Sequence, residues 1–79
     1  MVAQDSREIA MQAQAIYEAR LKSELERSHF GEFVAIEPIS GDHFLASSLS
    51  EAIQAARKSH PDRLGFAMRV GSQTTVQIG

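Results

Sequence analysis

The residues best suited to proton transfer near neutral pH are the three histidines, His29, His43 and His60. They are 14 and 17 residues apart, so no two share a helical face or a strand edge. A metal site usually begins with a local pair of ligands, such as two histidines four residues apart on a helix. The chain has no cysteine, which also excludes thiolate sites. The pattern therefore predicts no metal ligands and no cofactor.

Hydrolytic chemistry would need a serine, a histidine and an acid in a defined arrangement. No serine lies in a glycine-flanked elbow, and the adjacent Asp42 and His43 read as a locally hydrogen-bonded turn. The glycines are too scattered to form a phosphate-binding loop. We therefore expect no catalytic residues and a non-enzymatic protein.

Basic residues are concentrated in one part of the chain, and they would form an anion or nucleic-acid contact surface. These residues are Arg57, Lys58, Arg63 and Arg69. The first two also suit the negative end of a helix dipole, whatever the ligand. The net charge of −2 and the lack of interleaved aromatic residues argue against nucleic acid as a partner. A nucleic-acid-binding regulator therefore remains the alternative function.

Hydrophobic and capping patterns predict the elements that position these residues. Asp5 with Glu8 forms a capping box, and a helix is expected over 6–28. Ser48 with Glu51 forms a second capping box, opening a helix that Pro61 stops. Alternating and β-branched segments predict strands over 32–37, 43–46, 64–70 and 74–78. The order predicts a single α+β domain, 1–79, with a mainly antiparallel sheet in the order 2-1-3 and both helices on one face. Whether 74–78 adds a fourth strand at the edge is left open by the sequence.

The apolar stripe of the first helix repeats every fourth residue: Ile9, Ala13, Tyr17, Leu21, Leu25. In a regular helix each such step turns the stripe by about 40°, so one sheet cannot cover it all. The sequence therefore predicts a homodimer whose interface contains Ile9, Ala13 and Ile16, with the sheet edge over 74–78 as the alternative contact. A chain of 79 residues without disulfides also gains from a partner subunit. The expected core is Phe33 or Phe44 with Phe66, under Leu21, Leu25, Leu49 and Ile53.

Neither a leader nor a membrane segment is predicted. The residues before the first helix have no basic segment that leads into an apolar one. The longest apolar runs, 33–36 and 44–46, fall well below the ~20 residues that a membrane-spanning helix needs. These features favour a cytoplasmic protein with no membrane partner.

Several short segments resemble known sequences. Gly31-Glu32-Phe33-Val34-Ala35-Ile36, after Tyr17-Glu18, is similar to small uncharacterised bacterial proteins in which a helix runs into a Gly-x-Phe/Tyr-Val-Ala-Ile strand. Residues 33–56 more faintly resemble the strand-strand-helix element of HicB-type antitoxins. Both resemblances imply a binding module produced beside a partner protein, and neither implies a catalytic residue. The leading hypothesis is a protein-interaction module, homodimeric and either antitoxin-like or an adaptor for a second protein.

Overall fold

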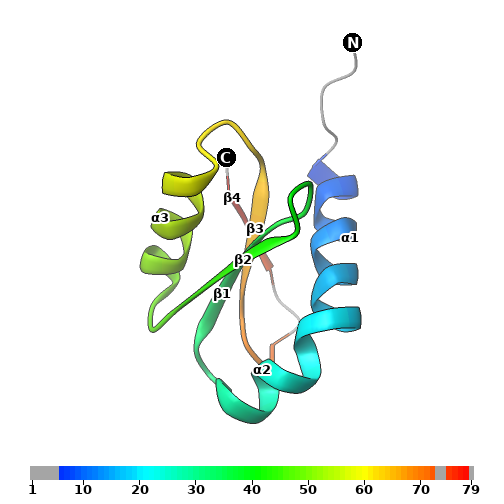
Figure 1. Ribbon diagram of the computed structural model, residues 1–79, viewed down its shortest axis with the longest axis vertical. Coiled ribbons are helices and arrows are strands. Elements are labelled where there is room, and N and C mark those ends of the chain that lie inside the picture. The colour runs from blue at the N-terminus through cyan, green and yellow to red at the C-terminus, as the bar shows by residue number, and fades with distance from the viewer. Residues whose placement is uncertain (1–5, 73–74, 79) are drawn as a thin grey trace.

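A computed structural model describes residues 6–72 and 75–78 of the chain and shows helices on both sides of a sheet (Figure 1). The elements are α1 (Ser6–Ile16), a π-helical segment η1 (Tyr17–Leu21), α2 (Lys22–Ser28), β1 (Phe33–Glu37), β2 (Asp42–Ala46), α3 (Leu49–Ser59), β3 (Gly65–Arg69) and β4 (Thr75–Ile78). This confirms the predicted order of helices and strands. None of the helices in the described residues is both long and apolar enough to cross a membrane.

The four strands form one sheet in the order β2-β1-β3-β4, with every neighbouring pair antiparallel. Phe33 lies opposite Ala46 on one side and Arg69 on the other, which fixes β1 in the centre. The predicted order 2-1-3 is confirmed, and β4 pairs with β3 at the edge. The predicted cap at Asp5 and the predicted first residue of the last strand, Thr74, lie outside the described residues.

The helices lie on opposite faces of the sheet, so the prediction that both share one face is wrong (Figure 1). Val34 and Ile36 of β1 belong to the core under α1, whereas Phe33 and Ala35 belong to the core under α3. Successive side chains of a strand point to opposite faces. Because the central strands are apolar at both odd and even positions, each face of the sheet must be covered.

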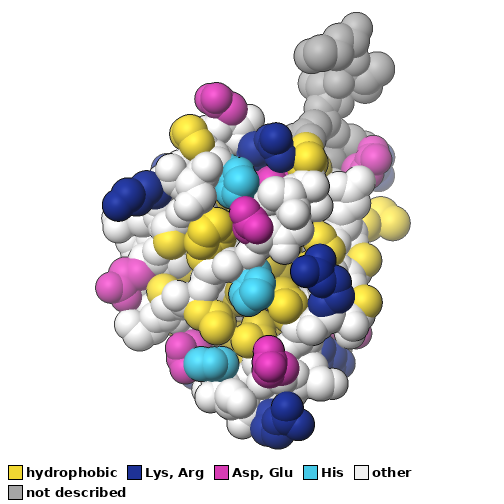
Figure 2. Space-filling model, viewed as in Figure 1, with side chains coloured by type: hydrophobic (Ala, Val, Ile, Leu, Met, Phe, Trp, Pro, Cys, Tyr) yellow, Lys and Arg dark blue, Asp and Glu magenta, His cyan; other side chains and the backbone are white. Residues whose placement is uncertain are grey.

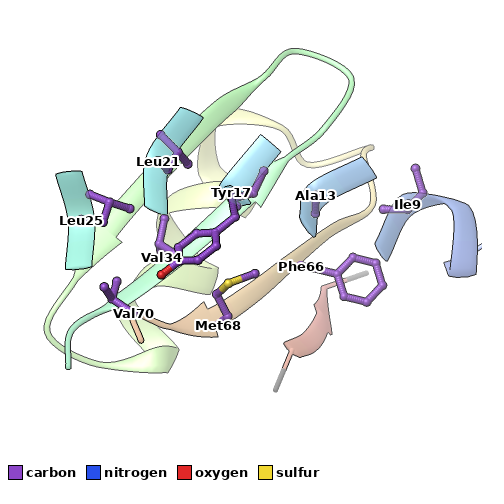
Figure 3. Close-up of a cluster of buried hydrophobic side chains, with 10 residues drawn as sticks. Ile9, Ala13, Tyr17, Leu21, Leu25, Val34, Phe66, Met68 and Val70 are labelled. Carbon is purple, nitrogen blue, oxygen red and sulfur yellow. The ribbon is translucent and has the colours of Figure 1, made fainter. Parts of the chain in front are cut away.

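The first helix buries its whole apolar stripe inside the protomer. Ile9 and Ala13 are 2% and 0% exposed, and they lie in one cluster with Tyr17, Phe66 and Met68 (Figure 3). Ile16 packs half-buried against the same cluster. The prediction that Ile9 and Ala13 form a dimer interface is therefore wrong, because both are buried against their own sheet. Ile16 keeps part of its surface exposed and stays a predicted contact, as does the homodimer itself.

The π-helical segment explains why the stripe does not wind away. The amide of Lys22 bonds to the carbonyl of Tyr17, five residues earlier. Such a turn holds one residue more than an α-helical turn. Four residues make more than one full turn of a regular α-helix but less than one turn of this wider segment. The apolar stripe therefore rotates back in the middle of the helix. Leu21 and Leu25 therefore return to the face that buries Ile9.

The core under α3 is built from small side chains. Ala52 and Ala56 of the helix meet Ala35 and Ala67 of the sheet, with Ile78 beside them. Larger residues surround this contact and are half-buried: Phe33, Phe44, Leu49 and Ile53. The predicted core residues are therefore divided between two layers, with buried Phe66, Leu21 and Leu25 on the other side. The predicted cap at Ser48 is confirmed, since its hydroxyl accepts a bond from the Glu51 amide at 3.2 Å.

Candidate functional site

The outer edge of β2 is open. β2 pairs with β1 on its inner side, and no described strand pairs with its other side. In an antiparallel sheet every second residue turns its N–H and C=O groups to the same edge. The β1–β2 register runs without a bulge from Phe33 opposite Ala46 to Glu37 opposite Asp42. β2 contains no proline and no lysine, residues that commonly protect such an edge, and its one Asp, Glu, Lys or Arg is Asp42 at its first position. The strand can therefore accept another strand.

Half-buried apolar side chains flank this edge on both faces of the sheet. Phe44 and Ala46 pack on the α3 side, whereas Leu45 packs on the α1 side. α3 contacts β1, β2 and β3, whereas α1 packs on β3 and β4. Leu45 of β2 therefore lies at the edge of the surface that α1 covers. In the view of Figure 2, with β2 in front, hydrophobic side chains gather in the middle of the molecule, between the two helices. The β2 edge thus combines free backbone groups with apolar surface.

A polar cluster holds the first residue of β2 in place; we define it as Glu37, Ser40, Asp42, His60 and Arg63. Nε2 of His60 lies 2.9 Å from Oδ2 of Asp42, which ties the loop after α3 to β2. The His60 ring also meets the Phe44 ring edge-on, with 6.1 Å between their centres. The two contacts of His60 therefore fix the start of β2 against the end of α3.

Glu37 is the buried charge of this cluster, with 2% of its surface exposed. Its carboxylate accepts bonds from the amides of Ile39 at 2.8 Å and Ser40 at 2.9 Å, and from Nη1 of Arg63 at 3.1 Å. Burial by itself would raise the pKa of Glu37, but the hydrogen bonds from Ser40 and Ile39 and the charge of Arg63 outweigh it, so the pKa is lowered. The ionised carboxylate therefore organises the turn between β1 and β2.

The polar cluster does not have the geometry of a hydrolytic triad. Ser40 Oγ and the Asp42 carboxylate both lie against Nε2 of His60, at 3.4 and 2.9 Å. A triad histidine instead contacts the acid and the serine through opposite ring nitrogens. The hollow beside the cluster holds about 10 Å³, which is room for at most one water. Among the described residues, no three His, Asp or Glu side chains could hold a metal ion.

The bond between Asp42 and His60 differs from what the sequence predicts. The sequence predicts a local hydrogen bond between Asp42 and its neighbour His43, yet the Asp42 carboxylate lies against a histidine 18 residues away. Sequence spacing carries no signal for this contact, because it depends on where α3 ends above the sheet. His29, by contrast, stays local and lies 2.9 Å from the Glu32 carboxylate.

Of the four basic residues singled out by the sequence, Arg69 lies apart from the others. Arg63, just before β3, bonds to the buried Glu37. Arg69, the last residue of β3, donates to the Gly31 carbonyl at 3.3 Å. Arg57 and Lys58 are exposed in the last turn of α3. Arg57 and Arg63 line the same hollow beside the polar cluster, so an anion contact there would not include Arg69.

A second hollow of about 110 Å³ lies beside the π-helical segment. The Tyr17 hydroxyl donates to Glu26 at 2.8 Å and accepts from the Gly71 amide at 3.3 Å. Burial, with the nearby carboxylates of Glu26 and Glu18, raises the pKa of Tyr17. Ligand pockets usually enclose about 300 Å³ or more, so this hollow is too small for an organic ligand of ordinary size.

Comparison of the chain with protein-family models, with curated proteins and with solved structures finds no match.

Proposed function

We propose that this protein is a non-enzymatic protein-interaction module that binds an extended segment of a partner protein along the β2 edge. The observation that carries the proposal is the open edge of β2 (Asp42–Ala46), which lacks proline, lysine and bulge. Strand addition is a common mode of peptide recognition, in which backbone hydrogen bonds supply affinity and alternate side chains supply selectivity.

The side chains beside the edge support this mode. A strand added to β2 would place its side chains alternately beside Phe44 on one face and beside His43 and Leu45 on the other. Phe44 and Leu45 are half-buried and would lose further contact with water. The expected ligand is therefore an extended segment of a partner protein, with apolar side chains alternating between the two faces of the sheet.

The polar cluster supports the proposal from the other end of the strand. It fixes Asp42 and Phe44 through His60, and it fixes the preceding turn through Glu37. A recognition strand that is already ordered loses little conformational freedom on binding, which favours affinity. The cluster thus acts in the proposed function as a support rather than as a catalyst.

The separation of Arg69 from the other three basic residues, and the bond of Arg63 to Glu37, leave the nucleic-acid alternative with less support than the sequence lends it. The resemblance to antitoxins that bind a partner protein agrees with the leading proposal. A cytoplasmic location, as the sequence predicts, is part of it.

The test is co-purification from the native cell with three forms of the chain: wild type, Leu45→Lys and a Gln54→Lys control on the exposed side of α3. Lysine at an edge strand opposes pairing. We expect a partner that both wild type and control retain and that Leu45→Lys loses, with circular dichroism showing that all three fold.

Hydrogen exchange on the reconstituted complex then locates the contact. Strand addition is expected to slow exchange of backbone amides within 43–46. A partner that Leu45→Lys retains, or protection confined to other elements, would contradict the proposal.

A further inference from the structure

The outer side of the first helix presents an uncharged stripe opposite the buried one. Residues 9–17 contain no Asp, Glu, Lys or Arg. Met11, Ala15 and Ala19 each lie two residues after a member of the buried stripe, so they point away from the sheet. All three are exposed, and Met11 is 71% exposed. Figure 2 shows hydrophobic atoms along the right margin, on the outer side of α1.

Charged residues of opposite sign lie at the two ends of this stripe. Glu8 is exposed one turn before Met11, and Lys22 is exposed just beyond Ala19. Lys22 Nζ lies 3.8 Å from the Glu18 carboxylate, with both side chains about half exposed, so it remains accessible to a second acid. A shallow, open hollow of about 480 Å³ runs along Arg7, Glu8, Met11, Gln12 and Ala15. The stripe therefore has an apolar centre, with Glu8 and Lys22 on its line at the two ends and Arg7 and Glu18 to its side.

We propose that this face of the first helix is a homodimer contact, in which two copies pack antiparallel around a two-fold axis through Ala15. This arrangement sets Met11 against the partner's Ala19 and Glu8 against the partner's Lys22. Small residues at the crossing allow the two helices to approach closely, toward the lower end of the usual 8–10 Å separation. The contact is independent of the strand addition proposed for β2, which lies on a different part of the surface.

The charge pattern selects a second copy as the occupant. With Glu8 at one end of the stripe and Lys22 at the other, the stripe complements itself only when the two copies run antiparallel. Both ion pairs then form at once, and the opposed helix dipoles add to the attraction. The uncharged centre with a methionine matches the composition of protein interfaces, which are depleted of charge and enriched in Met.

Charge exchange tests the pairing directly. Sedimentation of wild type, from about 1 to about 500 µM, should show the mass rising from 8.7 kDa toward twice that value. Glu8→Lys and Lys22→Glu should each weaken dimerisation by about tenfold or more, because like charges then meet at both ends. The double exchange Glu8→Lys with Lys22→Glu should restore it.

Ala15→Glu tests the axis, since it sets two carboxylates against each other and should abolish the dimer, whereas Gln54→Glu on α3 should not. Circular dichroism confirms that each exposed-site variant folds. A wild type that stays monomeric over the whole range overturns the proposal. So does a dimer that tolerates Ala15→Glu, or a double exchange that fails to restore pairing.

Discussion

Nη1 of Arg63 lies 3.1 Å from Oε1 of Glu37, a carboxylate that is almost completely buried at the end of β1. The two residues are 26 positions apart, and their pairing joins the loop before β3 to the turn between β1 and β2. A buried charge that lost this partner and its amide donors would be strongly disfavoured. The pair is therefore central to the support of the proposed binding edge.

Glu37 should make the stability of the protein depend on acid pH. Its pKa in the folded state is lower than the 4.5 of an unperturbed glutamate, so its ionisation stabilises the fold fully above about pH 4.5. That contribution is lost as the pH falls through the folded-state pKa. Urea unfolding of wild type and Glu37→Gln should show a gap of about 1–3 kcal/mol near neutral pH. The gap should shrink below about pH 4.5; a gap independent of pH would contradict this role.

Arg63 should differ from the two basic residues of α3. Arg63→Gln leaves the buried Glu37 carboxylate without its cation and should cost about 1–3 kcal/mol of unfolding free energy. The matched variant Arg57→Gln with Lys58→Gln removes only exposed charges and should change the free energy of unfolding by about 0.5 kcal/mol or less.

The same double variant, Arg57→Gln with Lys58→Gln, tests the alternative function. Salt-sensitive retention on a nucleic-acid column that it abolishes would favour a nucleic-acid-binding protein.

The amino-terminal half of the first helix should contribute to stability within a single protomer. Ile9→Ala removes a side chain from the core and should cost about 2–5 kcal/mol. Met11→Ala is the matched control, because Met11 is 71% exposed and its loss should cost about 0.5 kcal/mol or less. Both are measured at a dilution where the wild type is monomeric. An Ile9→Ala variant as stable as the control would show that the helix does not pack on the sheet there.

The π-helical segment should be dispensable once its extra residue is removed. Deleting Ala19, an exposed residue of this segment, brings Leu21 three residues after Tyr17, a spacing that a regular α-helix keeps on one face. We expect this deletion to cost about 1 kcal/mol or less, because exposed sites are tolerant.

A deletion in α3 provides the contrast. Removing Gln54 rotates Ala56 by about 100° away from the sheet. Calorimetry should show that this second deletion costs several times more than the first. Equal losses would mean that the wide turn does not absorb the extra residue.

The sequence by itself determined the elements and their order. Local signals mark them: the Ser48 cap, the stop at Pro61, and the alternation in 64–70 all act over a few residues, and the structure contains the corresponding helices and strands. The antiparallel order of the first three strands also followed, because a short turn and one crossover leave few arrangements.

The tertiary structure decided everything that depends on how those elements meet. Whether α1 and α3 share a face could not be read from either helix alone, since each has a buried stripe that fits either side of the sheet. The burial of Ile9 on the same face as Leu21 and Leu25 depends on one wide turn at Tyr17–Leu21. Packing against the sheet favours this turn over a regular helix. The contacts of Asp42 with His60 and of Glu37 with Arg63 join segments that are distant in the chain, so their geometry exists only after the sheet and α3 have assembled.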